Sequence, residues 1–235
     1  MRSRPEIKAI GKAAFQVNYW NCVLTALLIT AILGALDWFT GGQSVQQAVQ
    51  GSREISNVTV RSNGGGLLRL LLAGPLGIGL NSFFVRNAIG DRAGLQVTTP
   101  ISAAFENYPR KLGGSLWKGL FIFLWSLLLL IPGIIKGFSY AMTEYILADC
   151  PNVKATDALK LSMRMMNGHK WEYFVLHLSF LGWGLLSLCT LGILGVFYVS
   201  PYWNSTKAVY YLEIREEALR TGAVTEEQLA GILPA

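Results

Sequence analysis

Charged residues are scarce in this sequence. Asp, Glu, Lys and Arg make up 14% of its 235 residues, against about 25% in a typical soluble domain, whereas 52% of the residues are hydrophobic and the mean hydropathy is +0.39. The core of a soluble protein of this size could not bury so many apolar side chains. The apolar segments are spread along the whole chain, so the composition predicts one integral-membrane domain and no separate soluble domain.

Histidine and cysteine, which build many metal and catalytic sites, are also few, with 2 and 3 residues. His169 and His177 belong to no HExxH motif and to no visible nucleophile arrangement. We expect Cys22 and Cys189 inside membrane spans and Cys150 at the inner surface, which is neither a disulfide framework nor a metal cluster. The sequence therefore predicts no catalytic residue, no metal, no cofactor and no enzyme. His177 is expected to be a hydrogen-bonded histidine within a helix bundle.

The basic residues are in excess, and the net charge is +6. Such an excess can indicate nucleic-acid binding, but basic-aromatic nucleic-acid motifs are missing from the sequence. The basic residues are instead interleaved with apolar segments. Anionic lipid headgroups at the cytoplasmic face are therefore the expected partner, and nucleic acid is not.

The longest uncharged stretch runs from Tyr173 to Thr206 and has 34 residues. A membrane-spanning helix needs about 20 apolar residues, so this stretch is too long for one pass and long enough for two short ones. The glycines of the run Thr190-Leu191-Gly192-Ile193-Leu194-Gly195 would then form the corner between the two passes.

The whole chain predicts an all-α transmembrane bundle of about six spans, forming a single domain over residues 1–220. We place the spans near residues 19–38, 68–86, 115–132, 134–149, 173–190 and 195–211. The second helix of each consecutive pair opens on a similar sequence, at Gly74-Pro75, Pro132-Gly133 and Gly192, which predicts three helical hairpins. Such corners are usually tight turns with close packing. The alternative is a substrate site near the midplane, formed by interrupted helices.

Basic residues are distributed unequally over the segments that connect these spans. Of the 20 Lys and Arg residues, only Arg53, Arg61, Arg69 and Lys136 fall on one side, and the other 16 fall on the opposite side. By the positive-inside rule the richer side faces the cytoplasm. The pattern therefore predicts that the N and C termini are both cytoplasmic.

The basic leader precedes an uncharged run from Ala13 to Leu36. A cleaved signal peptide has a similar pattern, but no clean cleavage site precedes a mature domain and further spans follow, so the first span is expected to stay in the membrane. Ser3 and Glu6 have the spacing of a capping box. The leader should be a helix along the inner headgroups, with four apolar residues on one face: Ile7, Ile10, Ala14 and Phe15.

Three polar segments complete the chain. We predict an external loop over residues 40–66. Its Asn57-Val58-Thr59 fits a glycosylation sequon, but this sequon is not used in most bacteria. We predict a cytoplasmic tail over residues 212–235, with a short helix capped by Thr225. Between the later spans, Thr156 is expected to cap a surface helix that ends near Gly168, with three polar residues facing water: Asp157, Lys160 and Arg164.

Ionisable groups inside spans are costly, so each requires an explanation. Asp37 and Arg69 lie near the outer ends, where the side chains can reach the interface. Lys136, Tyr140 and Glu144 follow one another at a spacing of four, which would put them on one face of a helix. Glu144 would be deep in the hydrocarbon. A structural polar contact and a ligand or proton site are the two interpretations, and the second makes these three residues the candidate ligand-binding site.

His169-Lys170-Trp171 is typical of the membrane interface, because tryptophan is enriched at headgroup depth. We therefore predict a membrane-interface role for these three residues.

The most distinctive residues lie between Tyr140 and Tyr211. They are Tyr145-Ile146-Leu147-Ala148-Asp149, Asp157-Ala158-Leu159-Lys160-Leu161-Ser162, Met165-Met166, Gly168-His169-Lys170-Trp171, Phe174, Leu178-Ser179-Phe180, Gly182-Trp183, Thr190-Leu191-Gly192, Pro201-Tyr202, Thr206, Ala208 and Tyr210-Tyr211. This pattern resembles the bacterial integral-membrane family catalogued as domain of unknown function 975, and with Tyr19-Trp20 the resemblance covers roughly residues 4–215. Cys150 stands where an Asn is expected before Pro151. The resemblance implies a bacterial multi-pass protein and supplies neither an activity nor functional residues.

Two classes of function follow from the sequence. We expect a non-enzymatic component of the bacterial inner membrane that binds lipid or protein partners, a second copy of itself included, and whose function survives Glu144→Gln. The alternative is a small-solute or lipid transporter or permease component with a site inside the bundle, whose ligand depends on Glu144. An intramembrane enzyme is a third class, for which the acid, base and nucleophile roles are not filled.

Overall fold

The computed structural model describes residues 2–39, 64–92, 94–128 and 130–231. These residues form helices and connecting turns, with no β-strand among them, which confirms the all-α class. The helices are α1 (Arg4–Val17), α2 (Tyr19–Phe39), α4 (Gly64–Ile89), α5 (Thr99–Phe105), α6 (Tyr108–Leu128), α7 (Leu130–Ser139), α8 (Thr143–Asp149), α9 (Ala155–Met165), α10 (Lys170–Cys189), the short π-helix η1 (Gly195–Val199), α11 (Ser200–Arg220) and α12 (Glu226–Leu229).

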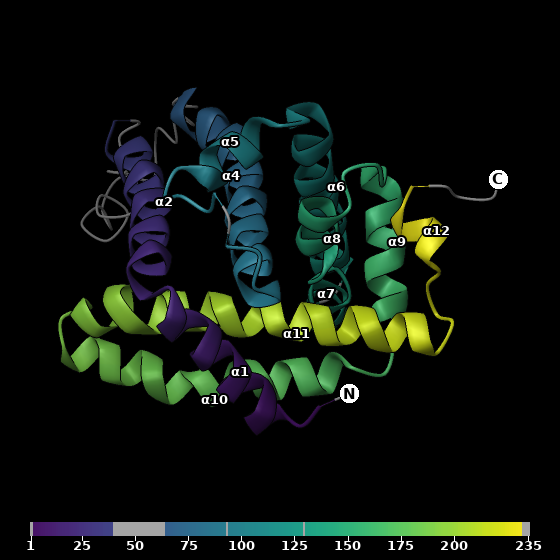
Figure 1. The fold of residues 1–235 in the computed structure, drawn as a ribbon. Helices are drawn as coiled ribbons and strands as arrows, with labels where there is room; N and C mark the ends of the chain where they lie inside the picture. Colours follow the sequence, from purple (N-terminus) through teal and green to yellow (C-terminus); the bar gives the residue numbers. More distant parts are fainter. Residues whose placement is uncertain (1, 40–63, 93, 129, 232–235) are drawn as a thin grey trace.

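The helices run in two directions. In Figure 1, α2, α4 and α9 stand upright, while α10 and α11 lie crosswise beneath them and α1 crosses in front. Helix α11 packs against α1, α4 and α9. Its Tyr210 and Tyr211 are fully buried, and their hydroxyls donate to the His169 carbonyl (3.2 Å) and to a carboxylate oxygen of Asp149 (2.8 Å).

Three helices are long and apolar enough to cross a membrane, over Tyr19–Leu36, Leu68–Ile89 and Lys170–Cys189. They coincide with the first, second and fifth of the six predicted spans. The segment predicted as the fourth span is not one helix, because α7 ends at Ser139 and α8 begins only at Thr143. Among the described residues, membrane-crossing length and composition therefore support three spans directly.

The N-terminal helix packs on protein. Ser3 and Glu6 form the predicted capping box, and Ile7 and Phe15 are fully buried. The apolar face lies against α11: Arg2 forms an ion pair with Glu213 (2.6 Å), and a Cβ on Gly11 would lie 2.8 Å from the Thr206 Cα. The predicted apolar face is confirmed and is covered by α11, while the position of this helix along the inner headgroups stays a prediction.

One of the three predicted glycine corners is a turn between helices. Leu191 and Gly192 have φ angles of 52° and 85° in the turn after α10, a conformation that glycine adopts readily. Gly74 and Pro75 instead lie inside α4, and Pro132 and Gly133 lie inside α7. At Gly74 and Gly133 an added Cβ would collide with Ser115 and Ser126 of α6, so these glycines allow close helix packing.

The polar segments differ in part from their predictions. Thr225 and Gln228 form a capping box at α12, as predicted for Thr225. Helix α9 begins at Ala155 with Lys154 as its N-cap, so the cap assigned to Thr156 is wrong, and Asp157 is buried. Residues 64–66 belong to α4, while the rest of the 40–66 loop and the Asn57 sequon lie outside the described residues.

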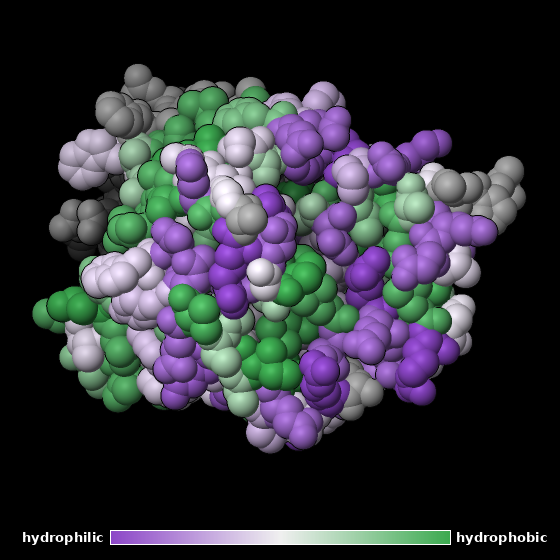
Figure 2. Space-filling model, viewed as in Figure 1, coloured by the Kyte–Doolittle hydropathy of each residue, from purple (hydrophilic) through white to green (hydrophobic). Residues whose placement is uncertain are grey.

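Apolar and polar residues gather on different parts of the surface. In Figure 2, hydrophobic residues cover the side of α2 and the left-hand end of the α10–α11 layer, and hydrophilic residues dominate the side of α9 and α12. At that end of the layer Leu188, Leu191 and Ile193 are 74%, 93% and 64% exposed. Exposed leucine and isoleucine at this density are typical of a surface that meets lipid or another protein.

Candidate functional site

Glu144 lies in the first turn of α8 and forms an ion pair inside the fold. Its Oε1 is 2.8 Å from the Lys118 Nζ of α6, and its Oε2 accepts a hydrogen bond of 3.4 Å from the Asn81 Nδ2 of α4. The side chains of Lys118 and Glu144 are 18% and 30% exposed. Partial burial strengthens such a pair and makes the loss of either partner costly.

The break between α7 and α8 sets the position of Glu144. Ser162 of α9 is fully buried beside it. Its hydroxyl donates to the Ser139 carbonyl (2.8 Å), at the last residue of α7, and accepts from the Met142 amide (3.1 Å), just before α8. These two bonds satisfy backbone groups that the interrupted helix leaves without partners. Helix α9 therefore holds the turn that aims Glu144 at Lys118.

The other end of α8 is held by Arg110 of α6. Its guanidinium donates to three carbonyls, those of Leu147 (2.6 Å), Cys150 (2.9 Å) and Val153 (2.7 Å). A cation at the C-terminus of a helix satisfies the last carbonyls and suits the helix dipole. Burial and the neighbouring Asp149 raise the pKa of the Cys150 thiol to about 11, which keeps it protonated and unreactive at neutral pH.

Lys207 of α11 brings a second cation close to Glu144. The two charges interact, but among the described residues no hydrogen bond or ion pair joins the Lys207 Nζ to an acceptor. The Nζ lies over the Trp203 ring, 5.3 Å from its centroid. Because Glu144 is already bound to Lys118 at 2.8 Å, two cations and one carboxylate leave the site with a surplus of positive charge.

Tyr145 and His177 complete the polar part of the site. The Tyr145 hydroxyl is buried and has no hydrogen-bond partner within the described part of the chain, although an unsatisfied buried hydroxyl is costly. The Nδ1 of His177 lies 2.9 Å from the Tyr173 carbonyl. A carbonyl only accepts, so Nδ1 carries the proton in this bond and Nε2 is left free. The ring lies 4.5 Å from that of Trp203.

These side chains line a pocket of about 400 Å³. Helices α4, α6, α7, α8, α10 and α11 all contribute to its wall, which consists of Asn81, Lys118, Ile122, Ile134, Gly137, Phe138, Ala141, Glu144, Tyr145, Tyr173, His177 and Lys207. A concave site with an apolar wall and a few convergent polar groups is the usual form of a small-molecule site. The Lys207 ammonium lines the pocket and has no hydrogen-bond acceptor among the described residues, so the complementary ligand group is an anionic oxygen.

A second pocket, of about 440 Å³, borders Glu144 as well. It is lined by residues of α4 and α6, among them Arg69, Gly74 and Ser115. Glu144 is the residue common to the two pockets. The Lys118–Glu144 pair therefore stands where the two spaces meet.

The predicted ligand-binding residues do not share one face. Glu144 lines both pockets, whereas Lys136 and Tyr140 line neither of these two. The Lys136 Nζ lies 4.9 Å from the centroid of the Trp125 ring, and Tyr140 is 4% exposed, near the Phe121 ring. The spacing of four fails here because residues 140–142 form a turn between two helices.

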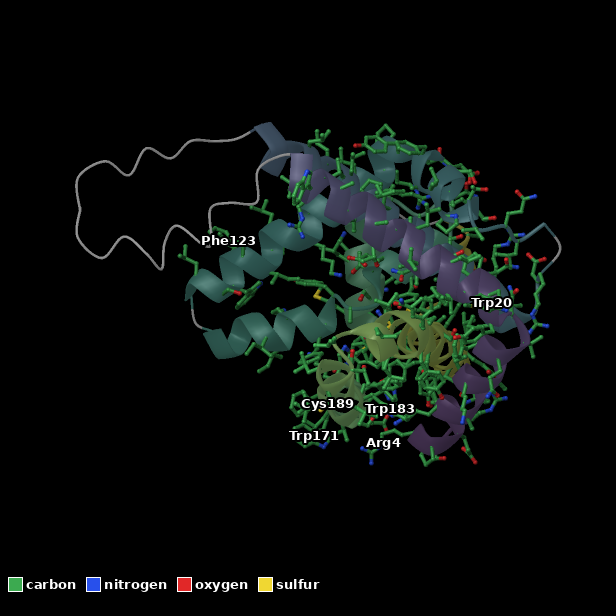
Figure 3. All side chains as sticks on the ribbon, turned by 90° about the vertical axis from the view of Figure 1, so that its left-hand side faces the viewer. Arg4, Trp20, Phe123, Trp171, Trp183 and Cys189 are labelled. Carbon is green, nitrogen blue, oxygen red and sulfur yellow. The ribbon has the colours of Figure 1, made fainter. Side chains whose placement is uncertain are left out.

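The predicted interface residues open α10. His169 is its N-cap, and the Nδ1 lies 3.2 Å from a carboxylate oxygen of Glu172. Trp171 is 71% exposed and lies on the outer surface, as Phe123 does at the far end of α6 (Figure 3). The membrane-interface role of His169, Lys170 and Trp171 stays a prediction.

Lys118 and Lys207 are the site residues that sequence reasoning missed. Both were assigned to cytoplasmic connections, because each lies close to the end of an apolar run. The expectation that His177 is hydrogen-bonded within the bundle is confirmed. No group of three or more His, Cys, Asp or Glu side chains that could hold a metal ion occurs among the residues that the structure describes.

The pocket belongs largely to a segment with known relatives. Residues 115–218 match the model of the family described as "Protein of unknown function (DUF975)". This segment is a DUF975 domain. It contains Lys118, Glu144, Tyr145, His177 and Lys207, while Asn81 and Arg69 come from the part of the chain that precedes it. No curated protein and no solved structure matches the chain.

Proposed function

We propose that this DUF975 protein is a multi-pass component of the bacterial inner membrane that binds an anionic ligand inside its helix bundle and carries out no chemistry on it. In this proposal the six apolar segments lie in the membrane, with both termini in the cytoplasm. The three long apolar helices support a membrane location, and the unequal distribution of Lys and Arg supports the orientation.

The surplus of positive charge in the pocket carries the proposal. Lys207 lines the pocket and has no hydrogen-bond acceptor among the described residues. A carboxylate or phosphate oxygen would accept a hydrogen bond from the Lys207 ammonium and neutralise its charge. A charge-assisted hydrogen bond of this kind is about twice as strong as a neutral one.

Neighbouring groups hold the polar side chains of the pocket in place. The Nδ1 of His177 is taken up by the Tyr173 carbonyl (2.9 Å), and its ring lies 4.3 Å and 4.5 Å from those of Tyr173 and Trp203. Glu144 is held by two donors. These polar side chains are fixed by their neighbours, which suits the orientation of a ligand.

A permease component is the second candidate, and the two-sided position of Glu144 favours it. Glu144 borders one pocket with Lys207 and another with Arg69. If the Lys118–Glu144 pair opened, the two spaces would join into a path between α4 and α11. A transported anion would then pass the carboxylate.

Native mass spectrometry after gentle extraction tests the proposal. We expect an acidic adduct on the wild-type protein and its loss in Lys207→Met, because the unpartnered cation is gone. Lys136→Met is the matched control, since Lys136 lies on α7 outside the pocket and its variant should keep the adduct. Lys207→Arg should keep it as well. An adduct that persists unchanged in Lys207→Met, or no adduct on any variant, contradicts the proposal.

A further inference from the structure

An apolar groove lies beside the anion pocket, between α7 and α10. It has a volume of about 310 Å³ and is lined by Ile134, Ile135, Phe138, Lys170, Trp171 and Phe174. Most of these side chains are open to the surroundings, with Ile134 52%, Ile135 47% and Trp171 71% exposed. Lys170 is the one charged residue of this lining.

The groove and the pocket share a wall. Ile134 and Phe138 line both of them. The Phe138 ring lies 5.9 Å from the His177 ring, which belongs to the pocket, and 5.9 Å from the Phe174 ring, which belongs to the groove. A molecule whose polar end lies in the pocket can therefore place its apolar part along Phe138 and in the groove while it stays in contact with the protein.

We propose that the ligand is an anionic phospholipid, whose phosphate is held by Lys207 and whose acyl chain lies in the groove. This inference rests on the proposed function and adds the class of ligand to it. The pocket alone would suit any small anion, whereas the adjoining groove suits an amphiphile. The excess of cations at the site matches a phosphate that carries a net negative charge, and each buried methylene adds to the affinity.

Lipid titration of the delipidated protein, followed by native mass spectrometry, tests this inference. The probes are phosphatidylglycerol, phosphatidylcholine with the same chains, and glycerol phosphate, which has the anion without the chains. We expect a one-to-one phosphatidylglycerol complex that is at least tenfold tighter than either of the other two. Ile135→Asn should weaken it about tenfold, the effect of losing about two methylene contacts.

Leu178→Asn is the matched control for the groove. Leu178 lies one turn beyond Phe174 on α10, is similarly exposed at 53%, and does not line the groove. Its variant should bind phosphatidylglycerol as the wild type does. Trp171→Ser provides a second groove variant on the other helix, with a loss in the same direction as Ile135→Asn.

The outcomes separate the two proposals. If both groove variants bind phosphatidylglycerol as tightly as Leu178→Asn does, or if glycerol phosphate binds as tightly as the lipid, the lipid inference is wrong and the anion pocket stands. If Lys207→Met binds phosphatidylglycerol like the wild type, the lipid inference and the proposed function both fall.

Discussion

At the scale of single residues, the site depends on three charges of which only two are paired. Lys118 and Glu144 are 2.8 Å apart, and Lys207 is left to a weaker interaction with the Trp203 ring. A carboxylate in such a place repels an anionic ligand, but it also keeps two ammonium groups from facing each other. Glu144 therefore stabilises the empty site and need not contact the ligand.

Glu144→Gln separates stability from binding. The amide has no charge for Lys118, so we expect the free energy of unfolding to fall by about 1–3 kcal/mol, between the values for exposed and fully buried pairs. The acidic adduct should persist or bind more tightly, because a negative charge leaves the pocket. Thermal unfolding in detergent and native mass spectrometry measure the two effects. Loss of the adduct at unchanged stability would favour the permease candidate.

Lys118→Met serves as the control in a double-mutant cycle with Glu144→Gln. Both partners of the pair are then neutral, so the double variant should be more stable than the sum of the single losses predicts. The coupling energy for residues in contact is typically about 0.5–3 kcal/mol. A coupling near zero would mean that the pair contributes nothing to stability.

The sequence was informative about some of these residues. Glu144 could be recognised because a carboxylate inside an apolar run requires a partner. Lys118 and Lys207 could not, because a lysine near the end of an apolar segment looks like a loop residue that marks the cytoplasmic side. Without these two, 14 of the 16 basic residues remain on that side against four on the other, so the predicted orientation does not depend on them.

At the scale of helices, the turn between α7 and α8 decides where Glu144 points. The sequence predicted one helix over 134–149, since residues 140–142 contain neither proline nor glycine. The interruption depends on Ser162, whose hydroxyl binds the backbone on both sides of it. A contact from a residue 20 positions further along leaves no local signal, so this part of the site was beyond sequence reasoning.

Ser162→Ala should loosen this turn. It leaves the buried Met142 amide without an acceptor, and we expect a loss of about 1–3 kcal/mol in the free energy of unfolding. For a protein of this size that is a fall of roughly 2–12 °C in the melting temperature. The acidic adduct should also weaken, because Ala141 of this turn and Glu144 just after it are part of the pocket wall.

Ser205→Ala is the matched control for Ser162→Ala. Ser205 is 1% exposed, as deeply buried as Ser162, but its hydroxyl has no hydrogen-bond partner among the described residues. Its removal should leave the melting temperature unchanged or raise it. Equal losses in the two variants would show that the volume of the hydroxyl matters and that its hydrogen bonds do not.

At the scale of the whole molecule, the described helices do not form a set of parallel passes. Helices α10 and α11 lie crosswise to α2 and α4 (Figure 1). Hydropathy cannot predict this arrangement, because the length of an apolar segment does not tell in which direction its helix runs. The class, the positions of the long helices and the apolar face of α1 were predictable from periodicity and capping. How many segments cross the membrane stays a prediction.

Labelling of single cysteines tests the predicted orientation. With Cys22, Cys150 and Cys189 replaced by serine, we expect Asn57→Cys to react with a membrane-impermeant maleimide in intact cells. Glu227→Cys, at an exposed position in α12, should react only after the cells are permeabilised. Labelling of Glu227→Cys in intact cells would mean that the C-terminal segment is outside.

The packing of α1 against α11 also bears on the order in which the protein is assembled. The main partner of α1 is α11, which comes late in the chain: Glu213 binds Arg2, and the Tyr202 hydroxyl reaches the Lys8 carbonyl (3.5 Å). Helix α4 comes earlier, and its Asn87 amide donates to the Ala14 carbonyl (3.0 Å). Because a ribosome makes α1 long before α11, the apolar face of α1 lacks its cover by α11 for most of translation. The nascent chain must keep this apolar face on the membrane surface or on a chaperone until almost the whole polypeptide has been made.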